Sequence, residues 1–131
     1  MMYCLDTSVA IEFLRENKAV VEKIGRVHAE RGEICITPVA LCELYKGVFL
    51  SLKKDTQLPI MEQFIESLIL LDFTRDASRL FGELYAQLYS KGKMTQENDL
   101  MIAAIAKAHG ATLITRNKKH FEHTGIKIEE W

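Results

Sequence analysis

Short runs of apolar residues alternate along this chain with longer segments of helical periodicity, and this alternation restricts the fold more than any other feature. The runs at residues 2–5, 33–36, 70–73 and 111–115 span four or five residues, and residues 126–128 form a shorter fifth. Nearly continuous apolar runs are typical of parallel strands buried on both faces. The sequence therefore predicts an α/β fold, a three-layer α/β/α sandwich with a central parallel sheet of four to five short strands.

Helical patterns fill the intervals between these runs. Thr37 and Pro38 are suited to the N-cap and first position of one helix, and Gly32, Gly92 and Gly110 are expected to end three others. The 131 residues contain no Pro-rich or Ser/Gly-rich linker and no repeat, so we expect one domain spanning residues 1–131. The expected helices cover residues 9–15, 18–31, 38–52, 60–68, 75–89 and 99–109.

Composition excludes several classes of protein. Seventeen Lys and Arg against eighteen Asp and Glu give a net charge of −1, so a strong positive field that coats DNA is absent. The three cysteines form no C-x-x-C pair, which favours small buried residues in a reducing compartment. No signal peptide and no membrane-spanning stretch is evident, so we expect a cytoplasmic protein without a membrane partner.

Acidic residues follow the predicted strands at positions that a parallel sheet would bring together. Asp6 comes directly after the first run, Glu43 lies in the helix after the second, and Asp99 begins the helix before the fourth. Because ligands bind beyond the carboxyl ends of parallel strands, we expect these acids at that edge. Carboxylates that meet there repel one another, and a hard divalent cation such as Mg²⁺ or Mn²⁺ relieves the repulsion. Such a site can activate water against a phosphodiester.

Each acid also has a simpler explanation. Asp6 could cap the following helix, and Glu97 and Asp99 could complement the dipole of theirs. Glu43 could pair with Lys46 on a solvated helix face. The basic group of Arg116, Lys118 and Lys119 could hold a phosphate backbone or lie in a solvated loop. These explanations treat each position separately and give no reason for three acids to meet.

Four short motifs occur in order along the chain. They are Leu5-Asp6-Thr7-Ser8-Val9, Glu43-Leu44-x-x-Gly47, Asp99-x-x-Ile102-Ala103-Ala104 and Thr115-Arg116-Asn117-x-x-x-Phe121. In this order they resemble the motifs of the PIN-domain family, most closely those of its VapC-type toxins. The resemblance covers essentially the whole chain, and its strength lies in the order of the motifs rather than in any one of them.

The resemblance implies a Mg²⁺- or Mn²⁺-dependent endoribonuclease that cleaves single-stranded RNA by metal-activated water. It implies that Asp6, Glu43 and Asp99 are catalytic and bind the metal, and that the polar residues beside them support the acids or bind substrate. Many members carry a fourth acid where this chain has His120, which leaves a second metal position to Glu97 or His120. The implied partners are an RNA substrate, a small antitoxin protein and a second copy of the chain. The supporting residues are Thr7, Ser8, Thr115, Arg116 and Asn117.

Two other functions are compatible with the same residues. A stand-alone PIN nuclease would process RNA without an antitoxin, whereas an overlapping upstream reading frame would favour the toxin. A catalytically silent PIN-like module would bind RNA or protein only, and the presence of all three acids argues against it. A small phosphatase is disfavoured, because it needs a second acid where this chain has Ser8.

Overall fold

Five short strands form one parallel sheet in the computed structural model, which describes residues 1–131. Their order across the sheet is β3-β2-β1-β4-β5, and every neighbouring pair is parallel. The predicted parallel sheet is therefore confirmed. The strands are β1 (Met2–Leu5), β2 (Glu33–Ile36), β3 (Ile69–Leu70), β4 (Thr112–Thr115) and β5 (Ile128–Glu130).

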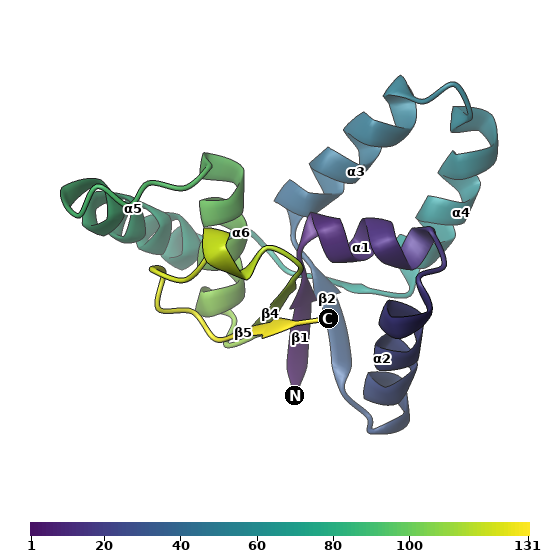
Figure 1. Cartoon of the computed structure of the whole chain (residues 1–131), viewed down its shortest axis with the longest axis horizontal. Coiled ribbons are helices and arrows are strands. Elements are labelled where there is room, and N and C mark those ends of the chain that lie inside the picture. The colour runs from purple at the N-terminus through teal and green to yellow at the C-terminus, as the bar shows by residue number, and fades with distance from the viewer.

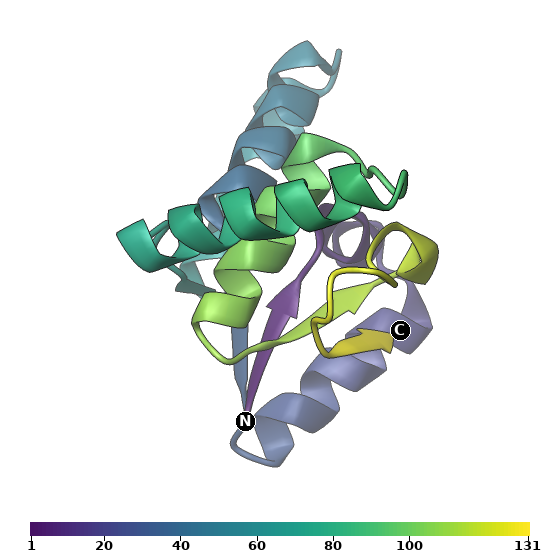
Figure 2. The same cartoon turned by 90° about the vertical axis from the view of Figure 1, so that its left-hand side faces the viewer.

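Helices cover both faces of this sheet and complete the predicted three-layer α/β/α sandwich (Figure 1). The connections from β1 to β2 and from β2 to β3 both move toward the β3 edge of the sheet. The helices in these two connections, α1 to α4, therefore lie on the same face of the sheet. The connection from β3 to β4 returns over the sheet, which places α5 and α6 on the other face, as Figure 2 shows. The helices are α1 (Thr7–Leu14), α2 (Lys18–Ala29), α3 (Pro38–Leu50), α4 (Lys54–Glu66), α5 (Arg75–Ser90) and α6 (Glu97–Ala108), with the 3-10 helix η1 (Lys118–His120) after β4.

The core lies where the central strands meet α6. Cys4 pairs in register with Cys35 on one side and with Leu113 on the other, and all three side chains are buried. Helix α6 packs between the sheet and α5, so its residues 102–106 are all buried. This burial on opposite sides explains the strongly apolar pattern of α6. These contacts bury apolar area, which is the main favourable contribution to folding.

Two predicted boundaries were wrong because tertiary packing overrides local preference. The helix expected at residues 60–68 begins at Lys54 and ends at Glu66, so α4 contains Pro59, and Met61 and Phe64 anchor it in the core. The third strand was expected at residues 70–73, but β3 is only Ile69–Leu70, although Leu71 still donates its N–H to Ile36 at 2.9 Å.

Gly32 does not end α2 as predicted. The helix ends at Ala29, and Arg31 takes the left-handed conformation with φ of 60°. Gly32 is needed there for space instead, since a Cβ would lie 2.7 Å from Cγ1 of Val27. Gly92 and Gly110 do adopt positive φ at the ends of α5 and α6, as expected.

The cysteines divide into two groups. Cys4 and Cys35 are buried, and burial raises the pKa of Cys35 to about 11 and that of Cys4 further, so both thiols stay protonated. Cys42 is exposed on α3, contrary to the expectation of burial.

None of the helices has both the length and the apolar character that a membrane span requires.

Two glycine substitutions should change stability in opposite directions. Gly110→Ala forces a Cβ into the left-handed region at the end of α6 and should lower the free energy of unfolding by about 1 kcal/mol. Gly82→Ala lies within α5 with open space around it and should raise that energy by about 0.5–1 kcal/mol. Urea denaturation of both variants checks this, and equal effects of the two would contradict the assigned backbone conformations.

Candidate active site

Asp6 is the most enclosed acid of the site, with 4% of its surface exposed. It directly follows β1 and is the N-cap of α1, where its Oδ1 accepts from the N–H of Thr7 at 2.9 Å. Its Oδ2 accepts from the hydroxyl of Thr115 at 2.9 Å and from that of Ser8 at 3.3 Å. Three donors therefore hold this buried carboxylate in one orientation.

The sheet topology explains why Thr115 reaches Asp6 across 109 positions of sequence. β1 and β4 are neighbours, and the N–H of Asp6 continues their ladder by donating to the carbonyl of Ile114 at 2.8 Å. The connections from β1 and into β4 run on opposite faces, so the carboxyl ends of this pair form the switch point where open parallel sheets bind ligands. Thr115 Oγ1 also accepts from the N–H of Asn117 at 3.0 Å, which fixes the chain leaving β4.

Glu43 reaches the same edge from α3. Thr37 caps this helix by accepting from the N–H of Ala40 at 3.1 Å, with Pro38 at the first position, as predicted. Glu43 is half-buried, and its Oε1 accepts from the hydroxyl of Thr7 at 2.7 Å. It forms no ion pair with Lys46, so the solvated-face interpretation was wrong.

Asp99 lies in the first turn of α6, whose N-terminus faces the carboxyl edge of the sheet (Figure 1). The helix dipole favours a carboxylate there. Its Oδ2 lies 3.2 Å from Nδ1 of His120, and its side chain is 16% exposed against 51% for the imidazole. His120 thus occupies the expected position of a fourth acid and contacts an acid instead.

The three acids of the site are coupled electrostatically. Burial, with repulsion from Asp99, raises the pKa of Asp6, while the hydrogen bonds from Thr115, Thr7 and Ser8 oppose the rise. Burial also raises the pKa of Asp99; His120 counteracts this and the charge of Glu43 adds to it. Asp99 therefore interacts with both other acids, and the three carboxylates form one electrostatic unit.

The donor set suits a hard divalent cation. Mg²⁺ in proteins takes one or two carboxylates and keeps several waters, and Asp6 with Asp99 supply two oxygen donors whose repulsion a cation removes. No three His, Cys, Asp or Glu side chains converge on one point, because Glu43 and Asp99 are turned toward Thr7 and His120. The chemistry of the two aspartates, rather than a converging set of three side chains, is what suits a cation, with Glu43 as the third coupled acid.

The remaining predicted residues lie around these acids. Arg116 is exposed, and its guanidinium donates to the main-chain carbonyl of Trp131 at 3.3 Å. Glu97 is exposed in the first turn of α6 and forms no hydrogen bond or ion pair with the acids. Sequence reasoning identified neither Lys93 nor His123 as a site residue. Both line a pocket with His120 and have no spacing motif to mark them.

Comparison with known proteins agrees with this geometry. Residues 3–127 match the PIN domain family. Ribonuclease VapC2 of Haemophilus influenzae is 30% identical over 132 residues, covering all of this chain and 98% of that protein. The tRNA(fMet)-specific endonuclease VapC of Shigella flexneri is also 30% identical with the same coverage.

Solved structures show the same likeness. The chain matches one from VapBC2 of Rickettsia felis bound to a promoter DNA fragment, with a TM-score of 0.94, 31% identity and coverage of 100% and 99%. A chain of DNA-bound VapBC from Salmonella typhimurium matches with a TM-score of 0.92 and 31% identity, over 100% of this chain and 98% of that chain. The chain belongs to the PIN-domain family. Within that family its full-length relatives are VapC ribonucleases, which confirms the resemblance of the motifs.

Replacing Asp99 by Asn should stabilise the metal-free protein at neutral pH. The raised pKa values mean that the folded state binds protons more tightly than the unfolded state. Protonation of the two aspartates therefore stabilises the folded state fully below their ordinary pKa of 3.8. This stabilisation is lost as the pH rises through the raised pKa values of the folded state.

Urea denaturation in EDTA across a pH series measures this effect. The difference in unfolding free energy between Asp99→Asn and wild type should grow in favour of the variant from about pH 4 upward. Asp76→Asn controls for the loss of one exposed carboxylate. A difference that does not change with pH would show that no carboxylate repulsion is relieved.

Proposed function

We propose that this chain is a divalent-metal-dependent endoribonuclease and the toxin of a type II toxin–antitoxin pair. The observation that carries the proposal is that the buried Asp6, at the switch point of the sheet, is close enough to Asp99 for the two carboxylates to repel each other. Relatives named as ribonucleases over the whole length support the reaction class. We further propose Asp6, Glu43 and Asp99 as the catalytic residues.

A Mg²⁺ or Mn²⁺ ion held by Asp6 and Asp99 would supply charge neutralisation for the phosphodiester and activation of water. Thr115 and Ser8 keep the Asp6 carboxylate in one orientation, so little reorganisation is needed during the reaction. Thr7 occupies Oε1 of Glu43 and leaves its Oε2 free to orient the attacking water. In-line attack gives a 5′-phosphate and a 3′-hydroxyl, and the ribose 2′-hydroxyl takes no part as nucleophile.

Cleavage of single-stranded RNA by the purified protein tests the proposal. Activity should require Mn²⁺ or Mg²⁺, disappear in EDTA, and fall at least about 100-fold in Asp99→Asn. Asp76→Asn, an exposed acid in the first turn of α5, is the matched control and should cleave like wild type. Undiminished cleavage by Asp99→Asn rejects the assignment, and RNA binding without any cleavage favours the silent module.

An apolar groove that includes Glu43 in its wall favours a protein that binds an antitoxin over a stand-alone enzyme. It measures about 360 Å³ and lies between α1, α3 and α4, with Glu43 in its wall. Phe13 of α1 does not line this groove, because its ring stacks on that of Phe64 with the ring centroids 4.3 Å apart. A partner segment with an apolar face would cover Glu43 when it fills the groove. The apolar lining residues are Ile11, Leu14, Leu44, Val48, Ile60 and Met61.

Ile60→Glu should release the protein from its antitoxin without harming cleavage. The side chain is 56% exposed at the groove, and a charge there opposes an apolar partner. The assay adds the product of an overlapping upstream reading frame, the candidate antitoxin that the toxin proposal requires, and measures inhibition of cleavage. Leu70→Glu, on the exposed edge strand β3, should be inhibited like wild type. Equal inhibition of both variants would contradict the groove.

The homodimer and the cytoplasmic location implied by the family resemblance belong to the same proposal. A toxin that acts on cellular RNA and binds an antitoxin meets both in the cytoplasm. Its oligomeric state follows from light scattering of the purified chain.

A further inference from the structure

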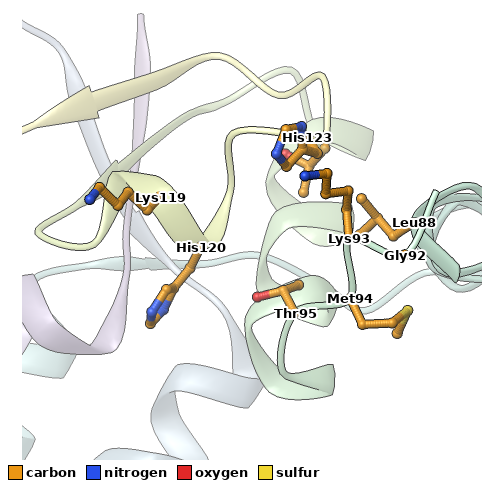
Figure 3. A pocket seen from close by; sticks show the side chains of 9 residues that line it. Leu88, Gly92, Lys93, Met94, Thr95, Lys119, His120 and His123 are labelled. Atoms are coloured by element: carbon orange, nitrogen blue, oxygen red, sulfur yellow. The ribbon is translucent and has the colours of Figure 1, made fainter.

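A second pocket adjoins Asp99, away from the groove that holds Glu43. It measures about 300 Å³ and lies between the end of α5, the loop into α6, and the turn from η1 toward β5 (Figure 3). Its wall includes His120, whose Nδ1 faces Asp99 at 3.2 Å. One side chain therefore separates this pocket from the proposed catalytic acids.

The lining of this pocket includes two lysines and no acid, although the chain as a whole has a net charge of −1. Lys93 and Lys119 supply positive charge, and the imidazoles of His120 and His123 add ring nitrogens that can donate to an anion. Lys93, Lys119 and His123 form no ion pair and no side-chain hydrogen bond, whereas Arg79 of α5 pairs with Glu83 at 3.1 Å. Cations gathered without counter-charge attract anions.

Two of these residues, Lys93 and His123, stand on fixed backbone. Gly92 and Lys93 close α5 with paired capping bonds, from Gly92 N–H to the carbonyl of Tyr89 and from Lys93 N–H to that of Leu88, at 3.2 and 2.9 Å. His123 lies two residues after Phe121, which is buried and whose carbonyl accepts from the hydroxyl of Thr124 at 2.6 Å. Figure 3 shows Lys93 and His123 beside each other, with His120 across the pocket and Lys119 extending away.

We propose that this pocket binds a backbone phosphate of the RNA strand, next to the phosphate that is cleaved. The proposal rests on the nuclease function argued above. Three neighbouring carboxylates repel a polyanion, and cations placed directly beside them offset that repulsion and fix the path of the strand. Lys93 and His123 supply the contacts, and their N–H groups donate to phosphate oxygens. A free phosphate has the same chemistry, so the test must separate the two.

Lys93→Ala tests the contact, and Lys91→Ala is its matched control. Both lysines are exposed and two residues apart, but only Lys93 lines the pocket. Fluorescence anisotropy with labelled single-stranded RNA, in an Asp99→Asn background, should show about 3- to 10-fold weaker binding for Lys93→Ala and less than about 2-fold for Lys91→Ala. The slope of log affinity against log salt should fall by about 0.7 for Lys93→Ala alone.

Kinetics and competition complete the test. In cleavage by otherwise wild-type protein, Lys93→Ala should raise KM and leave kcat within about twofold, because the contact is made equally in ground and transition states. Adding His123→Ala should raise KM further. Equal RNA affinity of Lys93→Ala and Lys91→Ala overturns the proposal, as does saturation of the pocket by millimolar inorganic phosphate without loss of RNA binding. If wild type cleaves no RNA but Lys93→Ala still weakens binding, the nuclease function fails while the phosphate site stands.

Discussion

The burial of two carboxylates beside each other is the constraint on which the rest of this structure depends. Asp6 and Asp99 are held at the carboxyl ends of the strands although burial raises the pKa of both. Repulsion from Asp99 adds to the rise at Asp6, and repulsion from Glu43 adds to the rise at Asp99. The fold partly offsets this with neutral donors at Asp6, the N-terminus of α6 and the imidazole of His120 at Asp99. An arrangement that opposes stability at neutral pH and is maintained by so many contacts is typical of a functional site.

The surroundings of the acids are divided by chemistry. On one side an apolar groove between α1, α3 and α4 reaches Glu43, and on the other a cationic pocket reaches Asp99 through His120. A protein segment suits the first surface and a nucleic-acid strand the second. Because the groove includes Glu43 in its wall and the pocket adjoins Asp99 through His120, a bound partner and a bound substrate would meet at the acids without sharing most of their contacts.

Much of the fold could be predicted from the sequence, because it depends on local pattern. The apolar runs at 2–5 and 33–36 are strands with those bounds, and Thr37 and Pro38 begin α3 as expected. The acids could be placed at one edge because parallel strands align their carboxyl ends. The role of Thr115 as a support of Asp6 was inferred from the family motif and agrees with its hydrogen bond.

What could not be predicted depends on contacts between distant segments. Pro59 lies inside α4 because Met61 and Phe64 pack in the core, and no local rule reports that. The contact of His120 with Asp99 requires the turn of η1, and the pocket beside it combines a helix end with a turn some thirty positions later. Lys93 and His123 carry no motif, so only the folded chain shows that they line one pocket.

A double-mutant cycle on Asp6→Asn and Asp99→Asn, measured as unfolding free energy with and without Mn²⁺, tests the central claim most directly. In EDTA each substitution should stabilise the protein, and the second should add less, with a coupling of about 0.5 kcal/mol or more. In Mn²⁺ wild type should gain stability that both single variants lose. Additive effects in EDTA, together with equal stabilisation of all four proteins by Mn²⁺, would show that the two carboxylates share neither repulsion nor a cation.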